Sequence, residues 1–254
     1  MILKKNTLFV VIGLLVISSL NAQTPEELIV YGNKLYQEGK YEDAIDSYQQ
    51  IISQGFESSS LYYNLGNAHF RTGKLGSAIL FYEKGLKLAP GDEDISYNLR
   101  IANARTIDQI TQLPKIFIIE WWEILITSLS LSLWAVITLV IYLVFLTSIG
   151  LYFLSRRISI QKISFLVSSI FLALLIISSV ILFSRYNYEA TTNYGILLET
   201  SYSVKTSPDV KGTDAFVIHE GIKFVIEDKV NDWYKIRLVD GKVGWIPKNS
   251  IGQI

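Results

Sequence analysis

The stretch YGNKLYQEGKYEDAIDSY at residues 31–48 recurs, with substitutions, as LGNAHFRTGKLGSAILFY at residues 65–82. The two copies are 34 residues apart, and the positions that they share hold mainly glycine, alanine, asparagine and tyrosine. Self-similarity at one fixed period is typical of stacked helical hairpins, each of which needs a neighbour to bury its apolar face. The sequence therefore predicts a domain of helical repeats.

The shared positions have distinct packing roles. Gly32 and Gly66 carry no Cβ and allow a neighbouring helix to approach closely. Gly39 and Gly73 are predicted to form the turn between paired helices, with a positive φ. Small residues are expected where the helices cross and an aromatic ring beyond the crossing, at Ala44, Ala78, Tyr48 and Tyr82.

The period and the residues kept at it resemble the tetratricopeptide repeat. Pro90 ends the second copy, because proline cannot continue a helix. The segment from Asp94 to Ile107 is predicted to be a capping helix that covers an otherwise exposed apolar edge. We assign residues 23–113 to this all-α domain.

The resemblance implies that the domain binds extended peptides or partner helices on the concave face, which the first helix of each repeat lines. Asparagine suits that role because its amide can pair with a peptide backbone as donor and as acceptor. Alternatively, the two repeated asparagines satisfy local loop or helix groups. The predicted binding residues are Asn33, Tyr36, Tyr63, Asn67, Phe70 and Arg71.

The N-terminus has the pattern of a secretory signal peptide, which we assign to residues 1–22. Lys4 and Lys5 precede an apolar stretch at residues 8–20, and Ala22 provides a cleavage point. The alternative is an uncleaved anchor. In both cases the chain that follows is predicted to be exported.

Two apolar runs, 124–154 and 163–184, contain no charged residue. Each is long enough to cross ~30 Å of hydrocarbon at ~1.5 Å per residue. We assign transmembrane helices to residues 121–154 and 163–184, the first with an interfacial start at Trp121 and Trp122.

The short segment between these helices, residues 155–162, fixes the expected orientation. It carries Arg156, Arg157 and Lys162, and basic residues are retained on the cytoplasmic side. Both flanking soluble regions are then predicted to face the periplasm from a bacterial inner membrane. This agrees with the signal peptide.

After a linker at residues 185–193, the pattern changes to short alternating runs with turn signals such as Asp240-Gly241. Five or six strands in residues 194–254 predict a small barrel. The pieces WYKI at 233–236 and GWI at 244–246 resemble the bacterial SH3-like family. Trp233 and Trp245 are candidates for stacking on a peptide or glycan, or alternatively structural residues of the barrel.

The composition argues against an enzyme. The chain has no cysteine, and its two histidines, His69 and His219, fall in different predicted domains, so no metal site or catalytic triad is expected. His69 is predicted to be packed in the core and His219 to be a turn residue. We predict no cofactor, and the balance of 23 basic and 23 acidic residues does not favour nucleic-acid binding.

The order of signal peptide, tetratricopeptide repeats, two transmembrane helices and SH3-like domain resembles the tetratricopeptide-containing member of the Bat aerotolerance-operon proteins, the BatE-like family. That resemblance implies membrane partners with von Willebrand-type A domains and a link to a MoxR-type ATPase and stress tolerance. The predicted function is a membrane-anchored protein–protein interaction scaffold. The alternative is an envelope sensor whose SH3-like domain binds cell-wall peptide or glycan.

Overall fold

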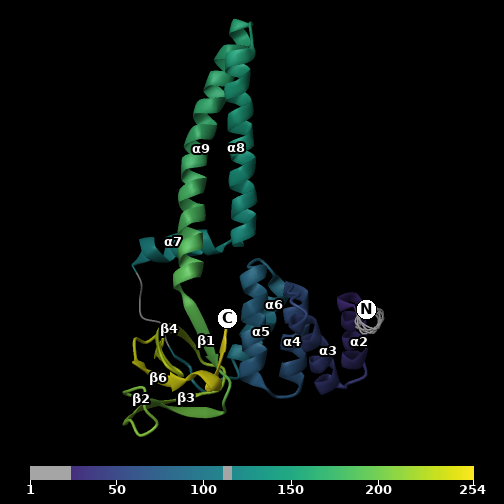
Figure 1. The fold of residues 1–254 in the computed structure, drawn as a ribbon, viewed down its shortest axis with the longest axis vertical. Coiled ribbons are helices and arrows are strands. Elements are labelled where there is room, and N and C mark those ends of the chain that lie inside the picture. Colours follow the sequence, from purple (N-terminus) through teal and green to yellow (C-terminus); the bar gives the residue numbers. More distant parts are fainter. Residues whose placement is uncertain (1–23, 111–115) are drawn as a thin grey trace, which may run out of the picture.

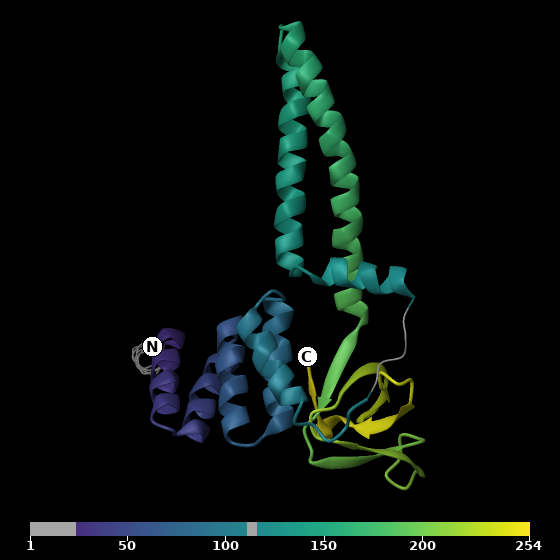
Figure 2. The same cartoon turned by 180° about the vertical axis from the view of Figure 1, so that it is seen from behind.

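The computed structural model describes residues 24–110 and 116–254, so the predicted signal peptide lies outside the described residues. The chain forms a helical repeat, a long helical hairpin and a β domain (Figure 1). The repeat and the β domain lie side by side at one end of the hairpin, as the reverse view also shows (Figure 2). The predicted fold class is confirmed, with an all-α repeat, two long apolar helices and an all-β domain.

The repeat consists of helix pairs, as predicted. Gly39 and Gly73 form the turns inside the two pairs with φ of 78° and 79°, the left-handed conformation that glycine adopts without strain. The helices are α2 (Pro25–Gln37), α3 (Tyr41–Ser53), α4 (Ser59–Arg71), α5 (Leu75–Leu88) and the capping helix α6 (Glu93–Asn103).

The predicted close approach of the paired helices is confirmed at both glycines. A Cβ placed on Gly32 would lie 2.5 Å from the ring of Tyr48, and one on Gly66 would lie 2.5 Å from the ring of Tyr82. Both tyrosines are buried. Any larger residue in place of either glycine would have to displace a ring in the tightly packed core.

The first apolar run differs from its predicted form. Instead of one helix over 121–154, the chain forms α7 (Phe117–Thr127), which lies across the hairpin, and α8 (Leu131–Leu154). Ser130 starts α8 by accepting a hydrogen bond from the Leu133 amide, so the chain turns at a serine-rich break rather than continuing straight.

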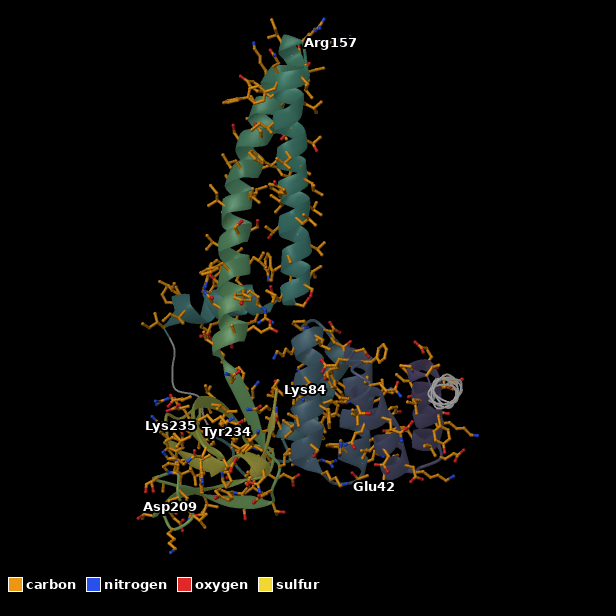
Figure 3. The ribbon with its side chains drawn as sticks, viewed as in Figure 1. Glu42, Lys84, Arg157, Asp209, Tyr234 and Lys235 are labelled. Carbon is orange, nitrogen blue, oxygen red and sulfur yellow. The ribbon has the colours of Figure 1, made fainter. Side chains whose placement is uncertain are left out.

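The second apolar run extends beyond its predicted ends. Helix α9 (Ile158–Thr191) includes most of the expected loop at 155–162 and most of the expected linker at 185–193. Arg157 lies at the far tip of the hairpin, opposite the two soluble domains (Figure 3). Among the described residues, α8 and α9 are the helices long and apolar enough to span a membrane.

The β domain is an antiparallel sheet in the order β3-β2-β6-β5-β4-β1-β7. Its strands are β1 (Asn193–Leu197), β2 (Ser201–Lys205), β3 (Asp214–His219), β4 (Lys223–Val230), β5 (Trp233–Arg237), β6 (Val243–Pro247) and β7 (Ile251–Gln253). The predicted strands correspond to β2 through β6. Strands β1 and β7 are additional, and β1 pairs with both β4 and β7.

The β domain packs directly on helix α5. Ile196 of β1 belongs to the same buried cluster as Ile79 and Leu80 of α5. A Cβ on Gly76 would overlap the carbonyl oxygen of Leu197, so the helix and strand backbones approach closely. The repeat and the β domain therefore share one apolar cluster at their interface, beside a separate core in each.

Polar contacts surround this interface. The Gly76 amide donates to Glu220 Oε1 over 2.7 Å, and Lys223 Nζ lies 2.7 Å from Glu83 Oε2. Asp108, beyond the capping helix, accepts from the backbone amide of His219 over 2.6 Å. Such bonds fix the orientation of the two domains as well as their contact.

Candidate functional site

The repeated asparagines form a hydrogen-bonded ladder along the first helices of the repeats. Asn33 Oδ1 accepts from the Tyr48 hydroxyl over 2.7 Å and from Asn64 Nδ2 over 3.1 Å. Asn67 Oδ1 accepts from the Tyr82 hydroxyl over 2.7 Å, and Asn98 supplies the second donor at 2.8 Å. Each oxygen thus links the buried tyrosine of its own repeat to the helix that follows that repeat, which is α4 for Asn33 and α6 for Asn67.

In Asn33 and Asn67, the oxygen and the nitrogen of the side-chain amide have different roles. Burial raises the pKa of Tyr48 to about 12 and raises the pKa of Tyr82 as well, so both hydroxyls stay protonated and donate. The hydrogen bonds assigned to Asn33 and Asn67 within the described residues use only Oδ1. Their Nδ2 groups can therefore donate to a ligand in the groove.

The concave face has a small cavity beside this ladder. Its volume is about 210 Å³. It brings together two of the predicted binding residues from α2, Asn33 and Tyr36, with Asn67 from α4. The full lining is Asn33, Tyr36, Gln37, Tyr48, Asn64 and Asn67.

The other predicted groove residues already have partners inside the domain. Arg71 donates to the Tyr41 hydroxyl over 2.9 Å and lies over that ring, while Tyr36 meets the same ring edge-on. Phe70 is covered by the guanidinium of Arg105, 4.5 Å from the ring centre. Arg71 and Phe70 are therefore held by contacts within the domain and do not line the cavity.

Tyr63 stands at the junction of the second repeat and the capping helix. Its hydroxyl accepts from Asn98 Nδ2 over 3.3 Å, and its ring lies 6.4 Å from that of Tyr82. The helix that caps the repeat therefore also continues the asparagine ladder.

Trp233 and Trp245 lie on one face of the β domain. Trp233 pairs with Pro247, and Lys235 pairs with Trp245, which puts all four side chains on the outer face of β5 and β6. Both tryptophans are half-buried. Trp233 also lines a cavity of about 610 Å³, with Val210 and the segments around Asp232 and Pro247. Trp245 is not in that lining.

The two histidines have different environments. His69 is packed in the core, stacked on Phe81 with the ring centres 5.2 Å apart. His219 does more than end a strand, because its Nδ1 lies 2.9 Å from a carboxylate oxygen of Asp108. It ties the chain that leaves the capping helix to the β domain, across 111 residues of sequence.

The interface on α5 was not predicted, although the sequence carries a signal for it. One repeat earlier, the positions of Gly76, Leu80 and Glu83 hold Glu42, Asp46 and Gln49. Those three are exposed on α3, whereas Gly76 and Leu80 are buried. A glycine and a leucine on an outer face that should be polar indicate a second packing partner.

Comparison with known protein families agrees with the helical repeat. A family model described as a tetratricopeptide repeat matches residues 32–93. The crystal structure of the C-terminal SH3 domain of myosin IB from Entamoeba histolytica is similar at 25% identity, covering 25% of this chain and 95% of that one, with a TM-score of 0.20. No curated protein matches the chain.

Proposed function

We propose that this protein is a membrane-anchored scaffold that presents two protein-binding modules on the periplasmic face of a bacterial inner membrane. Tetratricopeptide repeats and SH3-like domains both favour a role in protein–protein interaction over catalysis. By the resemblance to the Bat proteins, the partners are membrane proteins with von Willebrand-type A domains, in a complex linked to a MoxR-type ATPase and stress tolerance.

The apolar cluster that joins the repeat to the β domain is the observation that carries this proposal. Ile196 of the β domain is buried against α5, and salt bridge Lys223–Glu83 closes over the contact. Two binding surfaces held at one fixed separation raise the effective concentration of a partner at the second surface once the first is occupied. Weak contacts can then assemble a stable complex.

The topology is testable because the chain contains no native cysteine. Single cysteines at the exposed positions Ser60, Thr200 and Ser159 sample the repeat, the β domain and the tip of the hairpin. In intact spheroplasts, an impermeant thiol reagent should label the first two and not the third. Labelling of the Ser159 site alone would reverse the proposed orientation.

Partner binding in the groove is best tested at a residue that does not stabilise the fold. Gln37 is exposed and lines the groove cavity, whereas Gln49 is exposed on the outer side of α3. A photo-crosslinking amino acid at position 37 should capture a membrane partner, and the same group at position 49 should not. Equal capture from both positions would rule out the groove.

The outer face of β5 and β6 favours a second candidate function, an envelope sensor that binds cell-wall peptide or glycan. Trp233 and Trp245 flank Lys235 there, and aromatic rings stack on sugar and peptide units. Sedimentation of the detergent-solubilised protein with isolated cell wall, lost on Trp233→Ala, would support the sensor. Co-purified membrane partners without such sedimentation would support the scaffold.

A further inference from the structure

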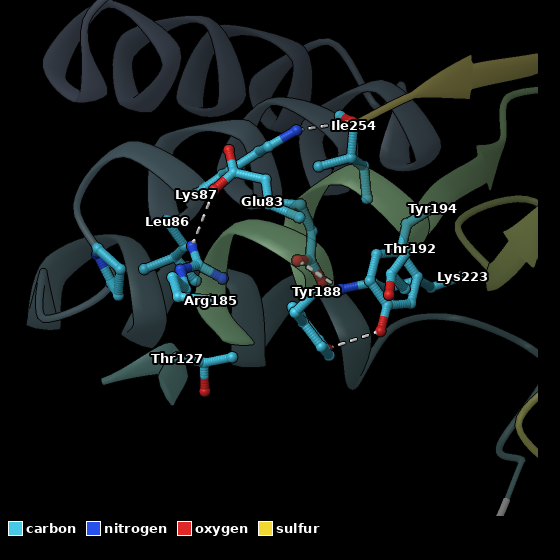
Figure 4. A pocket seen from close by; sticks show the side chains of 12 residues that line it. Glu83, Leu86, Lys87, Thr127, Arg185, Tyr188, Thr192, Tyr194, Lys223 and Ile254 are labelled. Carbon is cyan, nitrogen blue, oxygen red and sulfur yellow. Dashed lines mark hydrogen bonds and ion pairs between the residues drawn. The ribbon is translucent and has the colours of Figure 1, made fainter. Parts of the chain in front are cut away.

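A cavity of about 380 Å³ lies where the hairpin, helix α5 and the β domain meet (Figure 4). That volume is within the range of small-molecule sites. Its lining combines charged, hydroxyl and apolar side chains from three parts of the chain, among them Glu83 and Lys87 of α5, Arg185 and Tyr188 of α9, and Tyr194 and Lys223 of the β domain.

Arg185 is the unusual member of this lining. Its side chain is only 7% exposed, and among the described residues its Nε has no hydrogen-bond partner. Within residues 24–110 and 116–254, its guanidinium pairs with one carboxylate, that of Glu189, at 3.5 Å. Buried guanidinium groups are normally satisfied, because an unpaired buried donor is costly. Arg185 also lines the cavity, and its incompletely paired guanidinium therefore points to a ligand that accepts hydrogen bonds.

The charge balance of the lining favours an anion. Among the side chains of the lining, three are basic and two are acidic. Glu83 is already paired with Lys223 at 2.7 Å, and Glu189 with Arg185. Within the part of the chain that the structure describes, Lys87 Nζ donates to the main-chain oxygen of Ile254 over 3.3 Å, and no acidic side chain pairs with it. Its ammonium group can therefore also bind a ligand.

Tyrosine hydroxyls add neutral donors. The hydroxyls of Tyr188 and Tyr194 lie 2.9 Å apart and join α9 to strand β1. Burial raises the pKa of Tyr194, with a further contribution from the bond to Tyr188, so this hydroxyl stays protonated. A planar guanidinium, an ammonium and a hydroxyl together suit an oxyanion with several acceptor atoms, such as phosphate.

The depth of the cavity indicates where such a phosphate would come from. Arg185 is the first charged residue after the apolar run 163–184, and Thr127 ends the apolar helix α7. In a bilayer, phospholipid phosphates lie just outside the hydrocarbon region, at the level where apolar spans end. Helix α7 exposes Phe117 and Trp121 beside the hairpin, as an interfacial helix does.

We propose that this cavity binds the phosphate group of an anionic phospholipid headgroup, with Arg185 and Lys87 as the charged ligands. The inference rests on the membrane placement proposed above. The bound headgroup would fill the space between the hairpin and α5, and would thereby help to fix the two soluble domains against the membrane surface.

The test uses the full-length protein in detergent, with short-chain phosphatidylglycerol, phosphatidylcholine and inorganic phosphate as separate probes. Native mass spectrometry and the melting temperature report binding. The wild-type protein should bind phosphatidylglycerol, and Arg185→Lys should weaken that binding ~10-fold because lysine keeps the charge but loses the guanidinium fork. Lys87→Gln, at an exposed position, should weaken it without affecting the fold.

Arg156→Gln is the matched control, since Arg156 is an exposed arginine near the opposite end of the hairpin. It should bind like the wild type. Equal affinity of all three variants for phosphatidylglycerol, or no binding by the wild type, would overturn the inference. Inorganic phosphate binding as tightly as the lipid would remove the lipid assignment. Carbonate extraction of native membranes tests the membrane placement separately, so its failure is distinguishable from failure at this site.

Discussion

Helices α3 and α5 are the second helices of successive repeats, yet their outer faces meet different surroundings. Their inner faces are nearly equivalent, with Tyr48 and Tyr82 each packed against a glycine and bonded to an asparagine. The outer face of α3 is polar and exposed. The outer face of α5 is buried under strands β1 and β7. One repeat is thus used for stacking alone, and the other for stacking and docking.

The difference teaches that the repeat pattern and the docking surface are specified by different positions of the same helix. The residues that recur with the 34-residue period lie on the inner face, where each repeat must pack against the next. The outer face can change without disturbing that fit. Exchanging residues between equivalent positions of α3 and α5 is therefore the direct way to test the comparison.

The largest effect is expected from Leu80→Asp, which gives α5 the residue that α3 carries at this position. Leu80 is buried against Gly252, and loss of a buried leucine typically costs ~2–5 kcal/mol, before adding an unpaired carboxylate. The β domain should undock from α5. Spin labels at the exposed positions Asp43 and Val210 should show a broadened distance distribution.

The reciprocal change, Asp46→Leu, is the control. Asp46 is exposed, so its replacement should change the free energy of unfolding by only ~0.5 kcal/mol and leave the distance distribution narrow. A narrow distribution in Leu80→Asp as well would mean that the α5 interface does not hold the domains together.

A second difference between the two repeats predicts that the stability of the protein depends on pH. His69 occupies the position of Leu35 in the first repeat. Burial, with a smaller contribution from Lys74, lowers the pKa of His69 to about 4. Because the unfolded histidine has a pKa of ~6.5, its contribution to stability is complete above that pH and falls as the pH drops toward 4. The loss should reach ~2 kcal/mol by pH 5, at 1.36 kcal/mol per unit.

His69→Leu should remove this dependence and make the second repeat resemble the first. Chemical denaturation of the protein at pH 7 and at pH 5 measures it. Leu35→His is the matched variant, and it should introduce a similar loss at low pH. A wild-type protein equally stable at both pH values would show that His69 is protonated without cost.

The smallest effect is expected where the two repeats agree. Asn67→Ala and Asn33→Ala each remove an acceptor of two hydrogen bonds, and each should cost ~1 kcal/mol or slightly more. The losses should be similar, since the two sites have the same partners. A cost confined to one variant would show that the ladder is not equivalent in the two repeats.

Sequence periodicity predicted the repeat because its packing depends on residues at fixed spacing, such as Gly66 against Tyr82. It predicted that Asn33 and Asn67 are equivalent but left open whether their amides bond within the domain or to a ligand, because the partner hydroxyls come from other helices. The predicted end of the second apolar helix, residue 184, is too early. The polar residues that follow continue α9, which the ion pair between Arg185 and Glu189 stabilises.

The cavity at Arg185 could not be predicted at all. Its lining joins residues from positions 83 to 254, and no local pattern relates them. The docking surface was closer to prediction. A comparison of Gly76 and Leu80 with the equivalent residues of α3 would have revealed it, because a buried helix face carries small or apolar residues where an exposed face carries polar ones.

Helix α9 passes into strand β1 with only Thr192 between them. A helix of 34 residues is ~50 Å long and stiff, and β1 is bonded on both edges and packed on α5. The chain therefore offers no flexible linker at this joint, and we expect the hairpin and the two domains to move as one rigid unit. A tilt of the hairpin would then reorient the groove, and a force on the groove would reach the tip near Arg157.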